Sequence, residues 1–251
     1  IAQGDPRIPG PNGELIQPTG NAAFGTPQVT QEFDPAWAYG WGKRHANWEF
    51  SAGVQHEVTD GMSVNLSFFR RVFVNYSAEN NRLQNAADFD PYSVTVPNDS
   101  RLPNSGQVLT GLYEVSPAKY GAEDAITTTA DNFGMRQQHW NGIDFTVNAR
   151  MNNGLLVQGG VSSGFTSTDA CDLNANLNNP SQLFCSTKTP FLTQVKLLGS
   201  YTLPYDIQLA GTFQSLPGQQ VLAFVQFTGP EISASLGRTS NTSTTAVNVI
   251  E

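Results

Sequence analysis

The sequence predicts an all-β protein, built as an antiparallel meander of long hairpins that forms part of a transmembrane β-barrel. Three observations support this fold class. Apolar and polar residues alternate over segments longer than ordinary strands. Tight turns join these segments in pairs. Long, polar connections separate one pair from the next, which is the arrangement found in barrels of the outer membrane.

The first hairpin shows the alternation most clearly. It runs from Asn47 to Tyr76, and its two arms are NWEFSAGVQHEV and SVNLSFFRRVFVNY. Asp60-Gly61 supplies the turn chemistry between them. Each arm has about ten or more residues, whereas globular strands usually have about five or six. A tilted strand needs roughly nine to eleven residues to cross a bilayer, so the arms are predicted to be long enough to do so.

Two more hairpins follow the same pattern. HWNGIDFTVNAR and LLVQGGVSSGFT flank the turn Asn152-Asn153-Gly154, and FLTQVKLLGSYTL and DIQLAGTFQSL flank Pro204-Tyr205. A further strand is expected in QQVLAFVQF. We therefore predict a loop or extended segment over residues 1–40 and a partial β-barrel over 41–251, with long loops at 77–137 and 167–190. Trp37, Tyr39 and Trp41, just before the first hairpin, are typical of an interfacial aromatic girdle.

Composition narrows the function classes. The chain of 251 residues carries 13 Lys+Arg against 21 Asp+Glu, a net charge of -8, which argues against nucleic acid as a partner. Only 14% of residues are charged, compared with roughly 25% in soluble domains. Uncharged polar residues suit a water-filled lumen, a sugar-binding face or a secreted β-protein. The chain begins at Ile1 without Met, so we expect it to be a piece of a longer protein.

Cys171 and Cys185 flank a polar loop rich in Asn and Ser. They could be two unrelated thiols. A pair in this position is better explained as a disulfide that closes the loop, which implies an oxidising compartment. Two cysteines and three scattered histidines argue against a structural zinc site, and we expect no metal and no cofactor.

The segments NWEFSAGVQHE, HWNGIDFTVNAR and FLTQVKLLGSYTLP, with the cysteine loop between the last two, resemble the outer-membrane barrel of TonB-dependent receptors. The likeness covers roughly residues 40–216. It is nearest to large receptors, common in Acidobacteria, that carry an N-terminal carboxypeptidase-regulatory-like domain. The resemblance implies a 22-stranded barrel with a plug, placed in the bacterial outer membrane.

The same resemblance implies nutrient uptake. Its partners would be membrane lipid, TonB, the plug and the remaining strands of the receptor, and a small-molecule or glycan ligand. The loops at 77–137 and 167–190 would bind ligand or gate its entry, although the sequence does not identify the ligand-binding residues. The sequence contains no TonB box, no plug and no terminal strand that ends in an aromatic residue, and it has too few strands to close such a barrel.

Two alternatives remain open at this stage. A secreted all-β hydrolase acting on esters or polysaccharides could use Ser162 of GVSSG as nucleophile, with His139 and Asp169 or Asp144 as partners. The motif lies inside an alternating strand rather than before a helix, and all three histidines precede the serine, which both depart from the hydrolase pattern. An extracellular adhesive β-protein without chemistry is the second alternative.

Two local features bear on metal binding and on a membrane environment. Asp172, Asn174 and Asn176 alternate like the start of a calcium loop, but Leu177 stands where such loops require glycine. Arg70 falls among the apolar positions of its strand, where it would cost about 2–4 kcal/mol at the middle of a bilayer and much less near an interface. Either a bulge at Phe68-Phe69 turns it inward, or the strand belongs to a soluble protein.

Overall fold

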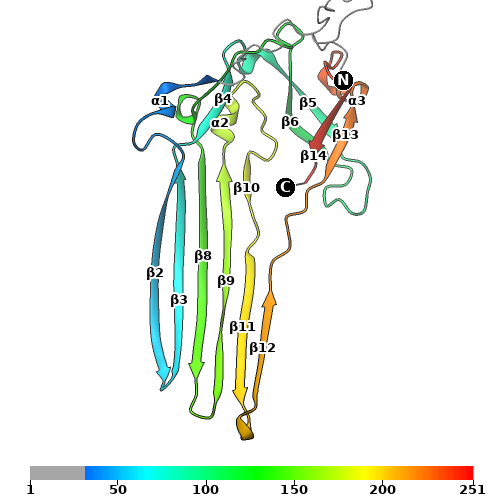
Figure 1. Ribbon diagram of the computed structural model, residues 1–251. Coiled ribbons are helices and arrows are strands. Elements are labelled where there is room, and N and C mark those ends of the chain that lie inside the picture. The colour runs from blue at the N-terminus through cyan, green and yellow to red at the C-terminus, as the bar shows by residue number, and fades with distance from the viewer. Residues whose placement is uncertain (1–31, 251) are drawn as a thin grey trace, which may run out of the picture. The chain divides into compact units, whose positions relative to one another are not determined.

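A computed structural model of the chain describes residues 32–250 (Figure 1). Most of the predicted loop over residues 1–40 therefore lies outside the described residues. The described part is mostly β-structure in antiparallel sheets, which confirms the all-β prediction. Two short elements of that N-terminal segment are described, the strand β1 (Glu32–Phe33) and the helix α1 (Pro35–Ala38).

The main sheet has seven strands, of which six are long and pair antiparallel one after another, while a short strand pairs with one of them beside this path. The path runs through the sheet in the order β12-β11-β9-β8-β3-β2, and within the described residues β2 and β12 are its two edges. The strands are β2 (Ala46–Thr59), β3 (Met62–Val74), β8 (Gln137–Arg150), β9 (Leu155–Asp169), β11 (Leu192–Thr202) and β12 (Gln208–Ser215). The sheet is thus an open meander, and the described residues form no closed barrel.

Tight turns join the long strands at one end of the sheet, here called the turn end (Figure 1). Gly61 and Gly154 adopt left-handed φ angles of 80° and 83°, as the turn sequences predict. The third turn places Tyr205 and Asp206 in the same left-handed region. A Cβ on Gly61 would lie 2.3 Å from the carbonyl oxygen of Arg150, so this turn also needs glycine for space.

The opposite end, here called the loop end, carries the long connections, and these are folded (Figure 1). The segment predicted as a loop over 77–137 contains two separate antiparallel strand pairs. The first joins β4 (Ser77–Asn81) to β7 (Ala125–Thr129), and the second joins β5 (Phe89–Thr95) to β6 (Val108–Val115). Two short 3-10 helices, η1 (Ala86–Asp88) and η2 (Ala130–Asn132), complete this connection.

The segment predicted as a loop over 167–190 contains the helix α2 (Cys171–Asn176) and the strand β10 (Ser186–Lys188), which pairs with the end of β9. Cys171 and Cys185 form the predicted disulfide. α2 places Leu173 in a small core with Tyr76, Ala78 and Ala130.

The residues after β12 turn away from the sheet. QQVLAFVQF contributes only β13 (Phe224–Thr228), which pairs with β14 (Thr244–Asn248) across the helix α3 (Gly229–Leu236). Pro217-Gly218 follows β12, and proline cannot donate a ladder hydrogen bond, so β12 ends there. A Thr228–Glu231 capping box begins α3, and Gly237 ends it with a φ of 76°.

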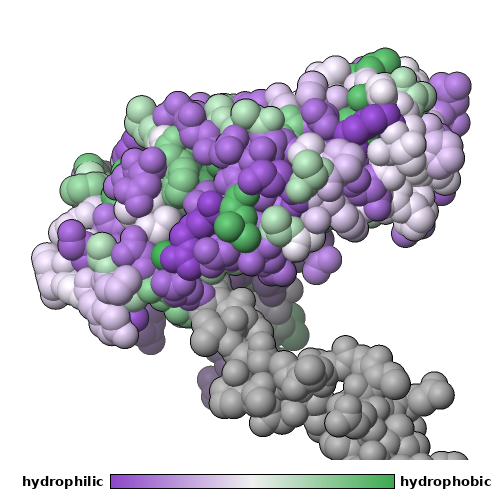
Figure 2. Space-filling view, turned by 90° about the horizontal axis from the view of Figure 1, so that it is seen from above, coloured by the Kyte–Doolittle hydropathy of each residue, from purple (hydrophilic) through white to green (hydrophobic). Residues whose placement is uncertain are grey.

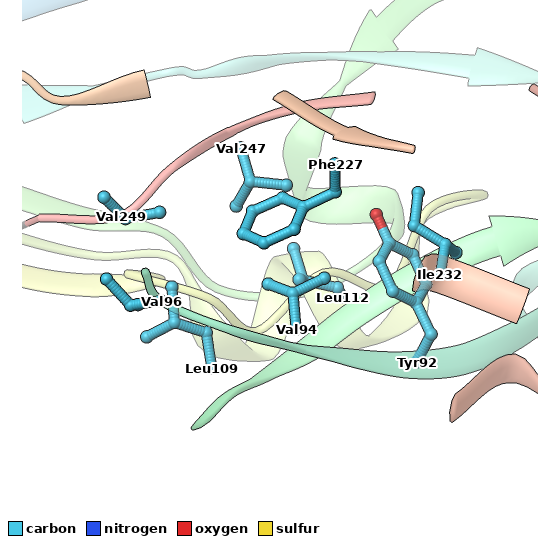
Figure 3. Packing of buried hydrophobic residues seen from close by; sticks show 9 residues of the cluster. All are labelled: Tyr92, Val94, Val96, Leu109, Leu112, Phe227, Ile232, Val247 and Val249. Atoms are coloured by element: carbon cyan, nitrogen blue, oxygen red, sulfur yellow. The ribbon is translucent and has the colours of Figure 1, made fainter. Parts of the chain in front are cut away.

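β13, α3 and β14 pack on the β5–β6 pair around the larger core of the described chain (Figure 3). The two sets of side chains face each other, with Phe227 and Val247 on one side and Val94 and Leu112 on the other. The nine buried residues are Tyr92, Val94, Val96, Leu109, Leu112, Phe227, Ile232, Val247 and Val249. The main hydrophobic core therefore lies at the loop end and not against the long sheet.

Candidate functional site

One face of the long sheet is apolar and exposed. The register aligns Val54, Leu66, Phe145, Val161 and Val195 in a single row across five strands. Val54 is 72% exposed and Leu66 56% exposed. The exposed apolar side chains of this face are Phe50, Val54, Leu66, Phe68, Ile143, Phe145, Val161, Leu197, Tyr201, Leu209 and Phe213. Trp48, which is also exposed, lies one row beyond the face toward the loop end, level with His139. Soluble monomers rarely expose a contiguous apolar patch of this extent.

The apolar face has defined limits along the strands. Toward the turn end it reaches the row of Leu155, Tyr201 and Leu209, and toward the loop end it reaches Phe50 and Phe165. On β9 these limits are ten residues apart, or about 33 Å along an extended strand.

Exposed aromatic side chains mark both ends of this face. Trp41 is 96% exposed and stands, like Tyr39, just before β2 at the loop end, and Tyr205 is equally exposed in the turn before β12. Among the described residues, Trp37 has an aromatic partner, unlike Tyr39 and Trp41: it lies in α1 and stacks on Phe33, with 6.0 Å between the ring centroids.

Arg70 lies on the apolar face, in the row of Phe50 and Asn141. The register of β2 and β3 runs without a shift through Phe68 and Phe69, so the bulge considered from the sequence does not form. Arg70 Nη1 donates to Asn141 Oδ1 at 3.1 Å, and this row is the loop-end limit of the apolar face. The neighbouring Arg71 points to the other face, where its Nε donates to Glu49 Oε2 at 2.7 Å.

The second face of the sheet is polar and contains two open concavities of about 500 and 430 Å³. Asn148 and Gln158 line both of them. Glu57 and Arg150 line the one nearer the turn end, and Lys196 lines the other. Carboxylate, amide, hydroxyl and ammonium groups thus share a water-accessible wall, and Met62 and Leu156 are apolar neighbours in the concavity nearer the turn end.

Trp140 is a feature of the polar face that alternation alone did not single out. Gly142 and Gly164 are cross-strand partners, and the indole ring covers both. A Cβ on Gly142 would lie 2.2 Å from Trp140 Cη2, and one on Gly164 would lie 2.6 Å from Cζ2. A large aromatic side chain two residues from a glycine, with a second glycine across the pair, is the signal that could have found it.

The hydrolase candidates do not come together. Ser162 lies on the polar face of β9 directly opposite Asp144 of β8. His139 pairs with Ser167, and Gln137 pairs with Asp169. Ser167 and Asp169 are five and seven residues from Ser162 on the same strand, so both His139 and Asp169 belong to the opposite face. Ser162 therefore has neither the predicted base nor Asp169 on its own face.

The candidate calcium ligands hold the loop together instead. Asp172 Oδ2 accepts the backbone N–H of Met135 at 2.7 Å, and Asn174 Nδ2 donates to Ser181 O at 3.0 Å. Asn176 Nδ2 donates to Asp172 O at 2.9 Å. Within residues 32–250 there is no group of three or more His, Cys, Asp or Glu side chains placed to hold a metal ion.

Several perturbed pKa values belong to contacts that stabilise the loop end. The hydroxyl of Thr128 and the backbone N–H of Ala36 donate to Asp34 and lower its pKa. Arg101 donates to Asp99 and lowers its pKa to about 2. Burial, and then the charge of Glu114, raise the pKa of Tyr92. These shifts accompany structural hydrogen bonds and core packing, so they do not indicate a catalytic group.

The geometry defines a class of protein: an antiparallel meander with one exposed apolar face, one polar face and folded connections at one end only. Comparisons with models of protein families, with curated proteins and with solved structures found no match to this chain. The helices of the described part of the chain are too short and too polar to span a bilayer.

Proposed function

We propose that this chain is a segment of an outer-membrane receptor of the TonB-dependent type, which takes up a small-molecule or glycan ligand. The observation that carries the proposal is the row of Val54, Leu66, Phe145 and Val161, exposed across four neighbouring strands. A sheet of this kind is stable where acyl chains cover its apolar face.

The dimensions of the apolar face support this environment. Its length of about 33 Å along β9, at the strand tilt of about 40° that barrels adopt, corresponds to a thickness of roughly 25 Å. That is the height of the apolar band on outer-membrane barrels. Trp41 and Tyr205, exposed beyond opposite ends of the face, suit the two interfacial girdles.

The polar face would then line the lumen, and the loop end would face the outside of the cell. Short turns on the periplasmic side and long connections on the outer side are the usual arrangement. Figure 2, viewed from the loop end, shows hydrophilic residues over most of this surface and hydrophobic residues in scattered patches. The free edges of β2 and β12 would pair with further strands of the receptor, which also needs a plug and TonB for energised uptake.

Two adjacent positions on β8 test the membrane environment. Phe145 belongs to the apolar face and Thr146 to the polar face. A nitroxide attached to a cysteine at each position, in the chain refolded into lipid vesicles, reports accessibility to oxygen and to a water-soluble nickel complex. We expect oxygen to dominate at position 145 and nickel at position 146. The proposal would be overturned if the nitroxide at position 145 were accessible to the nickel complex, or if the chain folded fully without lipid.

The orientation is tested on whole cells that carry the protein in their outer membrane. Arg101, whose side chain is 86% exposed at the loop end, and Asp60 in the first turn are replaced separately by cysteine. A membrane-impermeant maleimide should label the Arg101→Cys variant on intact cells and the Asp60→Cys variant only after the outer membrane is opened. The reverse result would exclude a receptor with its long connections outside.

A further inference from the structure

The connection between β3 and β8 is one long hairpin with a joint in its middle. Along the chain, the pair of β4 and β7 is next to β3 and β8, the pair of β5 and β6 forms the middle of the connection, and the two pairs belong to different sheets. Residues 82–88 and 116–124 lie between the pairs. The contacts across the joint are of two kinds. The exposed contacts run from Arg82 Nε to Asp124 Oδ2 at 2.9 Å and from Lys119 Nζ to Leu83 O at 2.8 Å, and exposed ion pairs such as the first stabilise weakly. The half-buried contacts are made by Gln84 Nε2, which donates to Lys119 O at 3.0 Å and to Ala122 O at 3.2 Å.

Beyond the joint, β5 and β6 pack with β13, α3 and β14, which follow β12 along the chain, and these five elements together are here called the outer module. Its nine-residue core is described above. Arg238 joins the β5–β6 pair to the segment after α3, because its Nε lies 2.7 Å from Asp90 Oδ2 and its Nη1 lies 2.7 Å from Glu114 Oε2. Ser235 Oγ also donates to Ser93 O at 2.7 Å. The module therefore has its own core and its own polar contacts.

The disulfide loop from Cys171 to Cys185, here called the strap, contacts both sides of the joint. On the inner side, Asn178 Nδ2 donates to Asn81 O at 2.9 Å and to Gln84 O at 2.7 Å. On the outer side, the backbone N–H of Gln182 donates to Gly111 O at 2.9 Å. The strap therefore spans from β4 to β6.

Apolar packing attaches the strap to the same two regions. Leu173 is 3% exposed and belongs to the small core beside Tyr76 and Ala130. Leu183 packs against the core of the outer module. Each end of the closed loop is thus anchored in a different hydrophobic cluster.

The strap fits closely and carries local strain. Gly111 has a φ of 78°, and a Cβ there would lie 3.1 Å from Leu183 N. Phe184, next to the disulfide, has a φ of 53°, which is unfavourable for a bulky residue. Such a conformation persists only where its surroundings hold it, and the neighbouring cross-link to Cys171 is one such constraint.

We propose that the strap is a brace that fixes the outer module at the joint, and that the module moves as a unit about the joint when the disulfide is opened. The inference concerns contacts within the loop end and does not depend on whether the long sheet faces lipid. The disulfide would then control the position of the outer module, whereas the module's own core would keep it folded.

The test compares amide hydrogen exchange of the wild-type chain with that of the Cys171→Ser/Cys185→Ser double variant. Both are measured in whichever medium, micelles or plain buffer, keeps the wild-type chain folded. We expect exchange over 82–88, 116–124 and the strap to accelerate on the order of 100-fold, the chain-entropy effect of opening a loop of about 15 residues. Exchange in β5, β6, β13 and β14 should stay slow. Loss of protection in the module together with the strap, or no change at the joint, would overturn the proposal.

A second variant separates the brace from the covalent bond. Asn178→Ala keeps the disulfide but removes the contacts with Asn81 and Gln84, and it should accelerate exchange at the joint only. Energy transfer between dyes attached to cysteines that replace Arg101 and Asp60 then reports the position of the outer module relative to the turn end of the sheet. The distribution of transfer efficiency should broaden in the disulfide variant, and an unchanged narrow distribution would contradict a moving module.

Discussion

An arginine introduced on the apolar face by substitution distinguishes a sheet that is covered by lipid from one that is covered by water. Leu66 lies in the middle of β3 in the central row of the apolar face, and Asn65 is its neighbour on the polar face. The Leu66→Arg and Asn65→Arg variants add the same charge to the same strand, one residue apart. Their difference therefore measures the medium that each face contacts.

The expected loss of stability in the Leu66→Arg variant follows from the depth of position 66 in the bilayer. Leu66 lies four residues from Met62 and four from Arg70, about 13 Å along the strand in each direction. At a tilt of about 40° this is roughly 10 Å of depth, which places Leu66 near the middle of a band of about 25 Å. An arginine there costs about 2–4 kcal/mol in a bilayer. In water, the same exposed position should change stability by no more than about 0.5 kcal/mol.

The assay is reversible denaturant unfolding of the chain in lipid vesicles, followed by tryptophan fluorescence. We expect the Leu66→Arg variant to lose about 2–4 kcal/mol and the Asn65→Arg variant less than about 1 kcal/mol. Equal losses in the two variants would refute the assignment of the apolar face to lipid, whatever the total stability of the chain.

Three further predictions concern turns and the loop end. Gly61→Ala should cost more than about 1 kcal/mol, because its φ is 80° and its Cβ would clash, whereas Gly42→Ala, with a φ of 69° and open space, should cost less; thermal unfolding of the two compares them. Arg238→Met should destabilise the outer module by about 2 kcal/mol in urea unfolding, since two carboxylates lose their charged partner. Hydrogen bonds from the backbone and then the hydroxyl of Thr228 lower the pKa of Glu231 below 4.5. The stabilisation of α3 by the Glu231 carboxylate should therefore be present above about pH 4.5 and disappear as the pH falls through the lowered pKa of the folded state. In the Glu231→Gln variant, amide hydrogen exchange in α3 should no longer show this dependence on pH.

The long strands could be predicted because their information is local. Alternation fixes which residues share a face, and the turn residues fix which neighbours pair, as at Asp60-Gly61 between β2 and β3. The same local rule bears on the hydrolase alternative, because the register places His139 and Asp169 on the face opposite Ser162.

The loop end could not be predicted in the same way, because its core is assembled from distant segments. Val96 and Val249 belong to one cluster, although two of the three long hairpins lie between them in the sequence. Its strands are short, and β5 contains Pro91, which obscures any alternation. The disulfide was predictable from two cysteines around a polar loop, but the joint that this loop spans depends on contacts with Asn81 and Gly111 that no local pattern reveals.

Arg70 and Arg71 link the fold to the proposed environment. They are adjacent in β3 and therefore point to opposite faces, and each has a partner suited to its face. Arg71 pairs with Glu49 on the polar side, whereas Arg70 meets the neutral Asn141 at the limit of the apolar side. At roughly 10 Å from the middle of the band, a long side chain can place its charge near the interface, where arginine costs about 0–1 kcal/mol. In the proposed lipid environment, Arg70 would thus lie at a depth where its charge is tolerated, whereas the same charge introduced four residues away at Leu66 is expected to be costly.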